Sequence, residues 1–393
     1  MELLLAQRVS RIKPSPTLAV TAKAAELKAQ GLDVLSLGAG EPDFDTPQHI
    51  KDAAIAALER GFTKYTAVGG IASLKAAIID KMKRDNGLDY TARQVLVSCG
   101  GKQSCYNLCQ AYLNATDEVI VPAPFWVSYP DMVLLADATP VIIPTTQATR
   151  FKITPEQLQR AITPRTRMIW LNSPSNPSGM AYSRAELAAL GEVLRRHPQI
   201  LIASDDMYEK ILWTGEPYAN IINACPDLYE RTIVIHAVSK TYSMTGWRIG
   251  WACGPARLIT AMTDIQSQST SNATSIAQVA AEAALNGPQD CVEQMRIAFK
   301  QRHDKLVADL NTIPGVDCAH GDGTFYVFPN VEGLMQRLGV ASDMELSDLL
   351  LEKVQVALVP GSAFGTPGHV RLSFATSERV LSGAVERIRS LVS

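Results

Sequence analysis

The chain has 393 residues, 47% of them hydrophobic, which is enough to bury one large core or two smaller ones. Its 37 Lys and Arg residues nearly balance 39 Asp and Glu residues, giving a net charge of −2. This balance argues against a nucleic acid or an anionic membrane as partner. The first residues lack the positive flank and apolar length of a signal peptide, and no apolar run is long enough to span a membrane.

The seven cysteines are odd in number and none is spaced as a CxxC pair. Such a set is typical of reduced thiols, so we expect a cytoplasmic protein. The six histidines show no metal-ligand spacing, and we predict no metal site.

The first 44 residues are punctuated by prolines, and we expect them to pack against the C-terminal part of the chain. Short apolar runs beyond them predict buried strands, and amphipathic stretches between the runs predict helices. The strands are expected at 94–98, 118–121, 167–171, 199–203 and 232–235, with helices at 102–113 and 183–196. This alternation predicts an α/β fold with a mostly parallel sheet covered on both faces.

Residues 255–286 predict one long helix or a helix pair, ended by Gly287 and Pro288. Helices are then expected at 289–310, 343–353 and 377–390, with short strands at 325–328, 357–359 and 370–374. We therefore expect a large domain over 45–287 and a smaller α+β domain built from 1–44 and 288–393.

Lys240 stands at the end of an apolar run, directly after Ser239 and eight residues before Arg248. Lysine forms a Schiff base with an aldehyde, and a hydroxyl with an arginine can bind phosphate. An aldehyde and a phosphate on one small molecule describe pyridoxal phosphate, an electron sink for amino-acid chemistry. To act as a base, Lys240 must have a pKa well below about 10.4, and we expect its Schiff base and Arg248 to lower it.

Polar residues end two other predicted strands, where ligands of open α/β sheets bind. Asp205 is a candidate partner for the pyridine nitrogen, because a carboxylate favours the protonated ring. Tyr208 and Asn176 are candidate donors to the ring oxygen, and Trp126 is a candidate lid over the ring.

A Gly-Gly-Lys segment at 100–102 lies between a strand and a helix, where backbone N–H groups can bind phosphate. It is not a nucleotide-binding P-loop, because Leu96 and Gln103 occupy positions that require Gly and Ser or Thr. The run from Gly38 is not a dinucleotide motif either, because Asp43 stands where its third glycine is needed.

Each residue has a plainer interpretation when it is taken alone. Asp205 would also cap a short helix at 206–210, and Trp126 would also be an ordinary core residue. Arg371, Lys13 and Lys102 would each be surface charges, Arg371 in an ion pair.

Considered together, the segments resemble the class I aminotransferases of the aspartate aminotransferase fold, and their prokaryotic-type aspartate aminotransferase branch in particular. The resemblance is carried, in order, by residues 10–15, 39–47, 63–66, 100–103, 126–130, 172–179, 204–208, 239–250 and 370–373. It implies the pyridoxal-phosphate-dependent transferase fold (fold type I), with a mostly parallel seven-stranded sheet in the large domain.

The resemblance also implies roles for individual residues. The implied catalytic residues are Lys240, Asp205 and Tyr208. Cofactor contacts are implied for Gly101, Lys102, Trp126, Asn176, Asp205, Tyr208, Ser239, Lys240 and Arg248, and for Tyr65 of the neighbouring subunit of a homodimer. Substrate contacts are implied for Gly40, Trp126, Asn176, Arg371, Lys13 and Lys102, with Arg371 binding the α-carboxylate.

The implied reaction moves the amino group of L-aspartate to 2-oxoglutarate, and the branch also includes enzymes that convert prephenate to arogenate. Some relatives bind the distal carboxylate with an arginine of the other subunit, but residues 267–272 contain none here. Lys102 and Lys13 are the candidate substitutes. A lyase of the same fold, an aminotransferase for aromatic or other neutral amino acids, and a non-catalytic regulator are the alternatives. A regulator would need room for a DNA-binding domain before residue 10.

Overall fold

The structure is a computed structural model that describes residues 3–12, 14 and 16–392. Its centre is a seven-stranded sheet in the order β2-β8-β7-β6-β5-β3-β4. These strands are β2 (Val95–Ser98), β3 (Glu118–Pro122), β4 (Thr139–Ile143), β5 (Thr166–Asn172), β6 (Leu201–Asp205), β7 (Thr232–Ala237) and β8 (Gly250–Cys253). Neighbours pair in parallel, except that β8 is antiparallel to both β2 and β7. The prediction of a mostly parallel seven-stranded sheet is confirmed.

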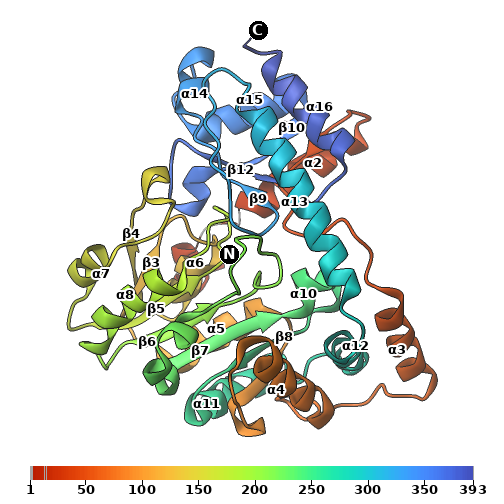
Figure 1. Ribbon diagram of the computed structural model, residues 1–393, viewed down its shortest axis with the longest axis vertical. Coiled ribbons are helices and arrows are strands. Elements are labelled where there is room, and N and C mark those ends of the chain that lie inside the picture. The colour runs from red at the N-terminus through yellow and green to blue at the C-terminus, as the bar shows by residue number, and fades with distance from the viewer. Residues whose placement is uncertain (1–2, 13, 15, 393) are drawn as a thin grey trace.

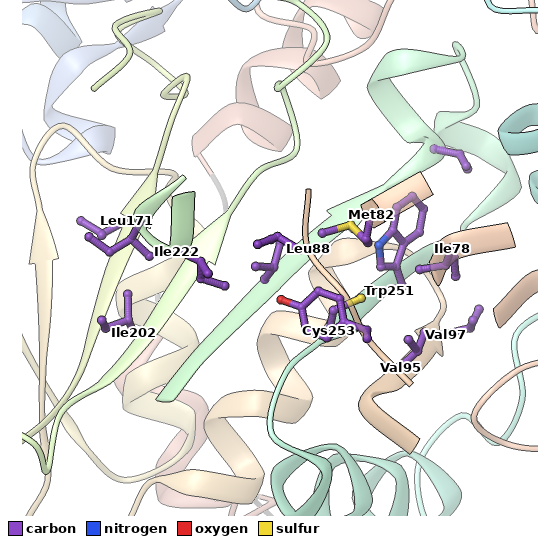
Figure 2. Close-up of a cluster of buried hydrophobic side chains, with 14 of the residues drawn as sticks. Ile78, Met82, Leu88, Val95, Val97, Leu171, Ile202, Ile222, Trp251 and Cys253 are labelled. Carbon is purple, nitrogen blue, oxygen red and sulfur yellow. The ribbon is translucent and has the colours of Figure 1, made fainter. Parts of the chain in front are cut away.

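Alternate side chains of the sheet enter two separate cores. Val95, Val97, Ile202 and Trp251 face helices α3 (Gln48–Glu59), α4 (Ala72–Asn86), α8 (Arg184–Arg195), α9 (Ile221–Ala224) and α12 (Ser275–Asn286). Figure 2 shows this cluster on its face of the sheet. Leu96, Ala203 and Ala252 point the other way, toward α5 (Gly101–Tyr112), α6 (Ser128–Leu135) and α11 (Ala256–Ser267). Helices on both faces explain why the strands read as continuous apolar runs.

A second group of elements lies above the large sheet in Figure 1. It contains the antiparallel sheet β11-β12-β9 and the parallel pair β1-β10. These strands are β1 (Leu35–Ser36), β9 (Tyr326–Val327), β10 (Val356–Ala357), β11 (Val359–Pro360) and β12 (Val370–Ser373). The helices around them are α2 (Pro16–Ala29), α13 (Asp290–Leu310), α14 (Glu332–Leu338), α15 (Asp343–Val354) and α16 (Glu378–Arg389).

Chain segments from both ends meet in this second group. β1 pairs with β10, and Arg387 donates a hydrogen bond to the backbone oxygen of Asp33 at 2.6 Å. Ala24 of α2 packs with Leu351 and Ala357 in a small apolar cluster. The N-terminal and C-terminal segments, red and blue in Figure 1, therefore lie side by side.

Capping side chains mark where several helices begin. Ser183 accepts a hydrogen bond from the backbone N–H of Glu186 at 3.2 Å, and the carboxylate of Glu186 accepts one from the N–H of Ser183 at 2.7 Å. This capping box starts α8 one residue later than the sequence predicts. Ser342 and Ser377 cap α15 and α16 through single hydrogen bonds.

Several predicted boundaries differ from the structure. Residues 255–286 form the pair α11 and α12, with a break between Ser267 and Ser275. β6 begins two residues later than predicted and runs through Asp205. Neither β4 nor β8 was predicted from the sequence. β4 is an edge strand with exposed positions, and these positions weaken its apolar pattern.

A buried charged cluster joins α4 to the turn after β6 and to β7. Lys81 donates a hydrogen bond to Glu209, and His236 Nε2 lies 3.2 Å from Glu209 Oε1. Burial alone would raise the pKa of Glu209, but Lys81 and His236 outweigh it and hold that pKa well below the usual value. Because Asp205 ends β6 and Tyr208 and Glu209 lie on the turn that follows, this cluster fixes the segment that carries both site residues.

We predict that Glu209→Gln lowers the free energy of unfolding by roughly 3 kcal/mol or more, because it leaves the Lys81 ammonium buried opposite a neutral amide. Urea denaturation measures the change. The control is Glu293→Gln, which breaks the exposed pair with Arg296 and is expected to cost about 1 kcal/mol or less. Equal losses in the two variants would contradict the prediction.

Candidate active site

A cavity of about 220 Å³ lies where the carboxyl ends of β5, β6 and β7 face the small antiparallel sheet. Residues from both groups of elements line it, including Asn172 at the end of β5 and Arg371 on β12. The position matches the expectation that ligands bind beyond the carboxyl ends of parallel strands.

Lys240 enters the cavity from α10 (Val238–Thr241), the short helix that follows β7 directly. Its ammonium group donates a hydrogen bond to the backbone oxygen of Gly40. Burial lowers the pKa of Lys240 to about 8; Glu41 opposes this change, while Arg371 and Arg248 add to it. From the sequence we expected Schiff-base formation and Arg248 to lower the pKa of Lys240, whereas burial is the largest cause in the structure.

Asp205 is the last residue of β6 and is 5% exposed. Its carboxylate accepts hydrogen bonds from the Tyr129 hydroxyl and, at 3.2 Å, from the backbone N–H of Met207. Burial raises the pKa of Asp205 to about 6, against the lowering effect of these two donors. Residues 206–210 form turns rather than a helix, so the alternative of Asp205 as a helix cap is wrong.

Arg371 is 2% exposed on β12, so its alternative interpretation as a surface ion pair is wrong. Its Nη1 donates to Asn176 Oδ1 at 2.9 Å and its Nη2 donates to the backbone oxygen of Gly38 at 2.8 Å. Its Nε is buried and has no hydrogen-bond partner among the described residues. Burial lowers the pKa of this guanidinium. A buried cation held by neutral groups is a receptor for an anion.

The start of α5 forms one end of the site with Arg248. Gly100 has a φ of +85°, and a Cβ there would lie 2.3 Å from Arg248 Nη2. A Cβ on Gly250 would lie 2.2 Å from the backbone N of Gly101. Both glycines are therefore required for β8 and Arg248 to approach the first turn of α5. N–H groups at a helix start beside a guanidinium favour a phosphate.

The side of the cavity near α6 is aromatic. The Trp126 ring lines it and meets the Tyr129 ring edge to face at 5.3 Å. Lys102 Nζ lies 5.1 Å from the Trp126 ring centre, and burial lowers the pKa of Lys102. Trp126 is therefore both part of the apolar packing and part of the cavity wall.

Nine of the residues singled out in the sequence line this cavity: Gly40, Gly101, Lys102, Trp126, Asn176, Asp205, Tyr208, Lys240 and Arg371. Ser239 and Arg248 are not among the lining residues. Ser239 is buried next to Lys240 in the chain, and the Arg248 guanidinium lies against Gly100. Tyr65 is 92% exposed and does not line the cavity. Lys13 lies outside the described residues.

Sequence reasoning assigned no role to Tyr129, Tyr326 or Thr17, which also line the cavity. Tyr129 follows Trp126 by only three residues, and its nearness to a predicted site residue was the available signal. Tyr326 lies in a correctly predicted strand, but the sequence does not show which face of that strand meets the cavity.

His303, Asp304 and His320 come together at a place that sequence spacing did not reveal, with candidate ligand atoms within 4.8 Å. His303 Nε2 accepts a hydrogen bond from the Gly321 N–H at 3.0 Å, and its Nδ1 lies 2.9 Å from Asp304 Oδ1. Both ring nitrogens are thus engaged, and we assign His303 a structural role.

The sheet, the lysine after β7 and the acid at the end of β6 define an enzyme of the aminotransferase class. Residues 32–388 match the family model "Aminotransferase class I and II", and the chain belongs to this family. It is 60% identical to the aspartate/prephenate aminotransferase of Nitrosomonas europaea, over 99% of this chain and all of that protein.

Two solved structures have the same fold. The aspartate aminotransferase of Rhizobium meliloti superposes with a TM-score of 0.95 at 46% identity, covering 99% of this chain and 98% of that one. The aspartate aminotransferase of Thermus thermophilus with maleate superposes with a TM-score of 0.94 at 42% identity, covering 99% and 100%.

The family is pyridoxal-phosphate-dependent, and the residues present fit that cofactor. The cavity offers a buried amine for an aldehyde, a buried carboxylate for a ring nitrogen and a glycine-formed helix start for a phosphate. The raised pKa of Asp205 shows that its carboxylate lacks a full counter-charge, which a protonated ring would supply.

We predict that Asp205→Asn makes the cofactor-free protein more stable at pH 7.5 by about 3 kcal/mol. Because the folded-state pKa of about 6 exceeds the ordinary 3.8, the wild-type protein loses stability as the pH rises from 3.8 to about 6, and the loss is constant above that range. The advantage of the variant should shrink by about half at pH 5.

Urea unfolding of the cofactor-free proteins at both pH values measures this difference. Asp309→Asn, at a surface carboxylate paired with Lys305, is the control and should show no gain that grows with pH. An Asp205→Asn variant less stable than wild type at both pH values would rule out the unfavourable burial of this charge.

Proposed function

We propose that this protein transfers the amino group of L-aspartate to 2-oxoglutarate, giving oxaloacetate and L-glutamate. The observation that carries the proposal is the convergence of Lys240, Asp205 and Arg371 on one cavity. The aspartate specificity is supported by relatives named aspartate aminotransferase and aspartate/prephenate aminotransferase at 50–60% identity. These names do not favour a lyase or an aminotransferase for neutral amino acids.

We also propose that prephenate is a second acceptor, converted to arogenate. The support is the name of the Nitrosomonas relative, which is 60% identical over nearly the whole chain. Prephenate is a dicarboxylate like the 2-oxo acids of the main reaction, so it can use the same α-carboxylate receptor.

The proposed cofactor contacts follow the geometry of the cavity. With the cofactor bound, Asp205 would pair with the ring nitrogen, Tyr208 and Asn176 would donate to the ring oxygen, and Trp126 would cover the ring. Gly101, Lys102, Ser239 and Arg248 bind the phosphate. When bound, pyridoxal phosphate supplies an aldehyde for amino groups and a ring that accepts electrons from the substrate Cα.

Lys240 is the proposed proton carrier. With a pKa of about 8 instead of 10.5, its neutral-amine fraction near neutral pH is far larger than that of an ordinary lysine, about a tenth at pH 7. With the cofactor bound, the neutral Nζ would take the proton from the substrate Cα and deliver it to the cofactor carbon that receives the amino group. Its flexible stem lets one nitrogen serve both positions, while the buried cavity limits competing water.

Arg371 is the proposed receptor for the α-carboxylate of amino acids and 2-oxo acids. Its two hydrogen bonds hold the guanidinium plane in place, and its Nε remains available for a substrate oxygen. We propose that Lys102 and Lys13 bind the distal carboxylate and that Gly40 contacts the substrate. Lys102 is supported by its place against Trp126 in the cavity wall.

We propose a homodimer with shared active sites, in which Tyr65 of each subunit reaches the phosphate of the other. Tyr65 is 92% exposed, an unusual setting for a large aromatic side chain. Leu3, Leu4 and Leu5 are each at least 75% exposed and form an apolar segment that a second subunit would cover.

We propose a large domain over 45–287 and a small domain formed by 1–44 and 288–393. The separate apolar clusters around the large sheet and around α13 support this division. We further propose a cytoplasmic location, which the seven free thiols favour. Among the described residues, no helix has the length and apolar character to cross a membrane.

A panel of amino donors with 2-oxoglutarate, followed by mass spectrometry, tests the proposed reaction. We expect L-aspartate to be the best donor, ping-pong kinetics, and arogenate when prephenate replaces the acceptor. A higher kcat/KM for aromatic donors, or release of ammonia without a transferred amino group, would contradict the proposal.

We predict that Lys240→Ala binds pyridoxal phosphate but loses transamination by several orders of magnitude, because it removes the amine that carries the proton from the substrate Cα. Borohydride treatment of wild type should label Lys240. Lys75→Ala is the control: this partly buried amine also has a pKa lowered by burial, but it lies outside the cavity. Near-normal turnover in Lys240→Ala would refute the assignment.

A further inference from the structure

Tyr326 on β9 contacts both Tyr208 and Arg371, for which different roles are proposed above. It is 1% exposed, and its hydroxyl lies 3.2 Å from the hydroxyl of Tyr208. The face of the same ring lies 4.4 Å from the guanidinium carbon of Arg371. One side chain thus contacts the proposed donor to the ring oxygen and the proposed receptor for the α-carboxylate.

We propose that Tyr326 is a positioning residue that couples these two parts of the site. Its ring holds the guanidinium of Arg371 in the plane that receives a carboxylate. Its hydroxyl holds the Tyr208 hydroxyl in the orientation that donates to the cofactor ring oxygen. The inference rests on the function proposed above and adds a residue to it.

The Arg371 guanidinium contacts two aromatic rings, with its central carbon 4.4 Å from the Tyr326 ring centre and 4.9 Å from the Phe364 ring centre. Hydrogen bonds to Asn176 and Gly38 fix one edge of the guanidinium, and the two rings fix its plane. Cation–π contacts of this kind stabilise a desolvated cation without neutralising its charge, so the charge remains available to a substrate anion.

The hydroxyls of Tyr208 and Tyr326 form a hydrogen bond with each other, and the two rings meet nearly at right angles. When Tyr208 donates its proton to a ring oxygen, Tyr326 becomes the donor within this pair. A hydroxyl that accepts a hydrogen bond is itself a stronger donor, because the two bonds polarise each other. Tyr326 therefore strengthens the interaction of Tyr208 with the cofactor.

Gly40 has no side chain, and this leaves room for the Tyr326 hydroxyl beside it. A Cβ at this glycine would lie 3.0 Å from the Tyr326 oxygen. The carbonyl of Gly40 accepts the hydrogen bond of Lys240, so the hydroxyl also touches the segment that holds the catalytic amine.

The charged and titratable groups that face the tyrosine pair are Arg371 from β12, Asp205 from β6, Glu41 next to Gly40, and Lys240, which also lines the cavity. All four remain in the variants described below. A change in the titration of the holoenzyme would therefore report the altered tyrosine contact rather than a lost charge.

Tyr326→Phe keeps the ring over Arg371 and removes the hydroxyl. We expect the pH midpoint of the visible absorbance of the holoenzyme to rise by about 0.4–1 unit, the equivalent of one lost hydrogen bond. The midpoint rises because a weaker Tyr208 donor leaves the ring oxygen more basic, so the neighbouring proton is held to higher pH. The Kd of maleate, a dicarboxylate probe, should stay within about twofold of wild type, since the cation–π contact remains.

Tyr326→Leu removes the ring as well, and we expect a maleate Kd roughly 3–30-fold above wild type by calorimetry with the holoenzyme. Phe364→Leu is the matched control, because it removes the other ring over Arg371 but has no described contact with Tyr208. It should weaken maleate binding similarly and leave the absorbance midpoint unchanged.

The inference is overturned if the absorbance midpoint of Tyr326→Phe equals that of wild type, or if Phe364→Leu shifts it as much. It is also overturned if Tyr326→Leu binds maleate like wild type. A wild-type protein that shows no visible cofactor band would instead contradict the proposed function, so the two failures are distinguishable.

Discussion

The arrangement of this protein depends on burying charged groups that do not neutralise one another. Asp205, Lys240 and Arg371 share a small cavity, and burial is the largest cause of the shifted pKa of each. Such groups are unfavourable in an empty site, and the surrounding fold must hold them there. In the proposed site the cofactor would supply a cationic ring opposite Asp205 and an aldehyde for Lys240, while the substrate would supply a carboxylate for Arg371, so the two molecules together would compensate all three groups.

Both sheets contribute to holding these charged side chains in the cavity. The large sheet supplies the acid and the amine from adjacent strands, because parallel strands end at the same edge. The small sheet supplies Arg371 and Tyr326 from two paired strands. Tyr208 connects them: it lies on the turn after β6, yet its ring packs in the cluster built around α13. The cavity therefore exists only where the two groups of elements meet.

The sequence predicted the elements whose local pattern was strong. Five buried strands, helices α5 and α8 and the lysine after β7 were located within a few residues, because continuous apolar runs mark strands covered on both faces. Helices α6, α7 (Pro155–Ala161) and α9, which also lie between these strands, were not predicted. Edge strand β4 was not predicted, because its exposed positions weaken the apolar pattern. A helix pair over 255–286 was one of the two predicted forms, but the position of its break after Ser267 was not predicted. Tyr129 and Tyr326 were missed as site residues because their partners, Asp205 and Arg371, are distant in sequence and only the fold brings them together.

The pairing of β1 with β10 has a consequence for synthesis on the ribosome. Leu35 emerges early, but its strand partner Val356 is made more than 300 residues later. The large sheet can form while translation continues, whereas the first segment must wait for the last to supply its hydrogen bonds. Arg371 follows Val356 in the chain, so the cavity is complete only after the segment that pairs with β1 has also been made, and a chain truncated before Arg371 would carry Asp205 and Lys240 without this guanidinium.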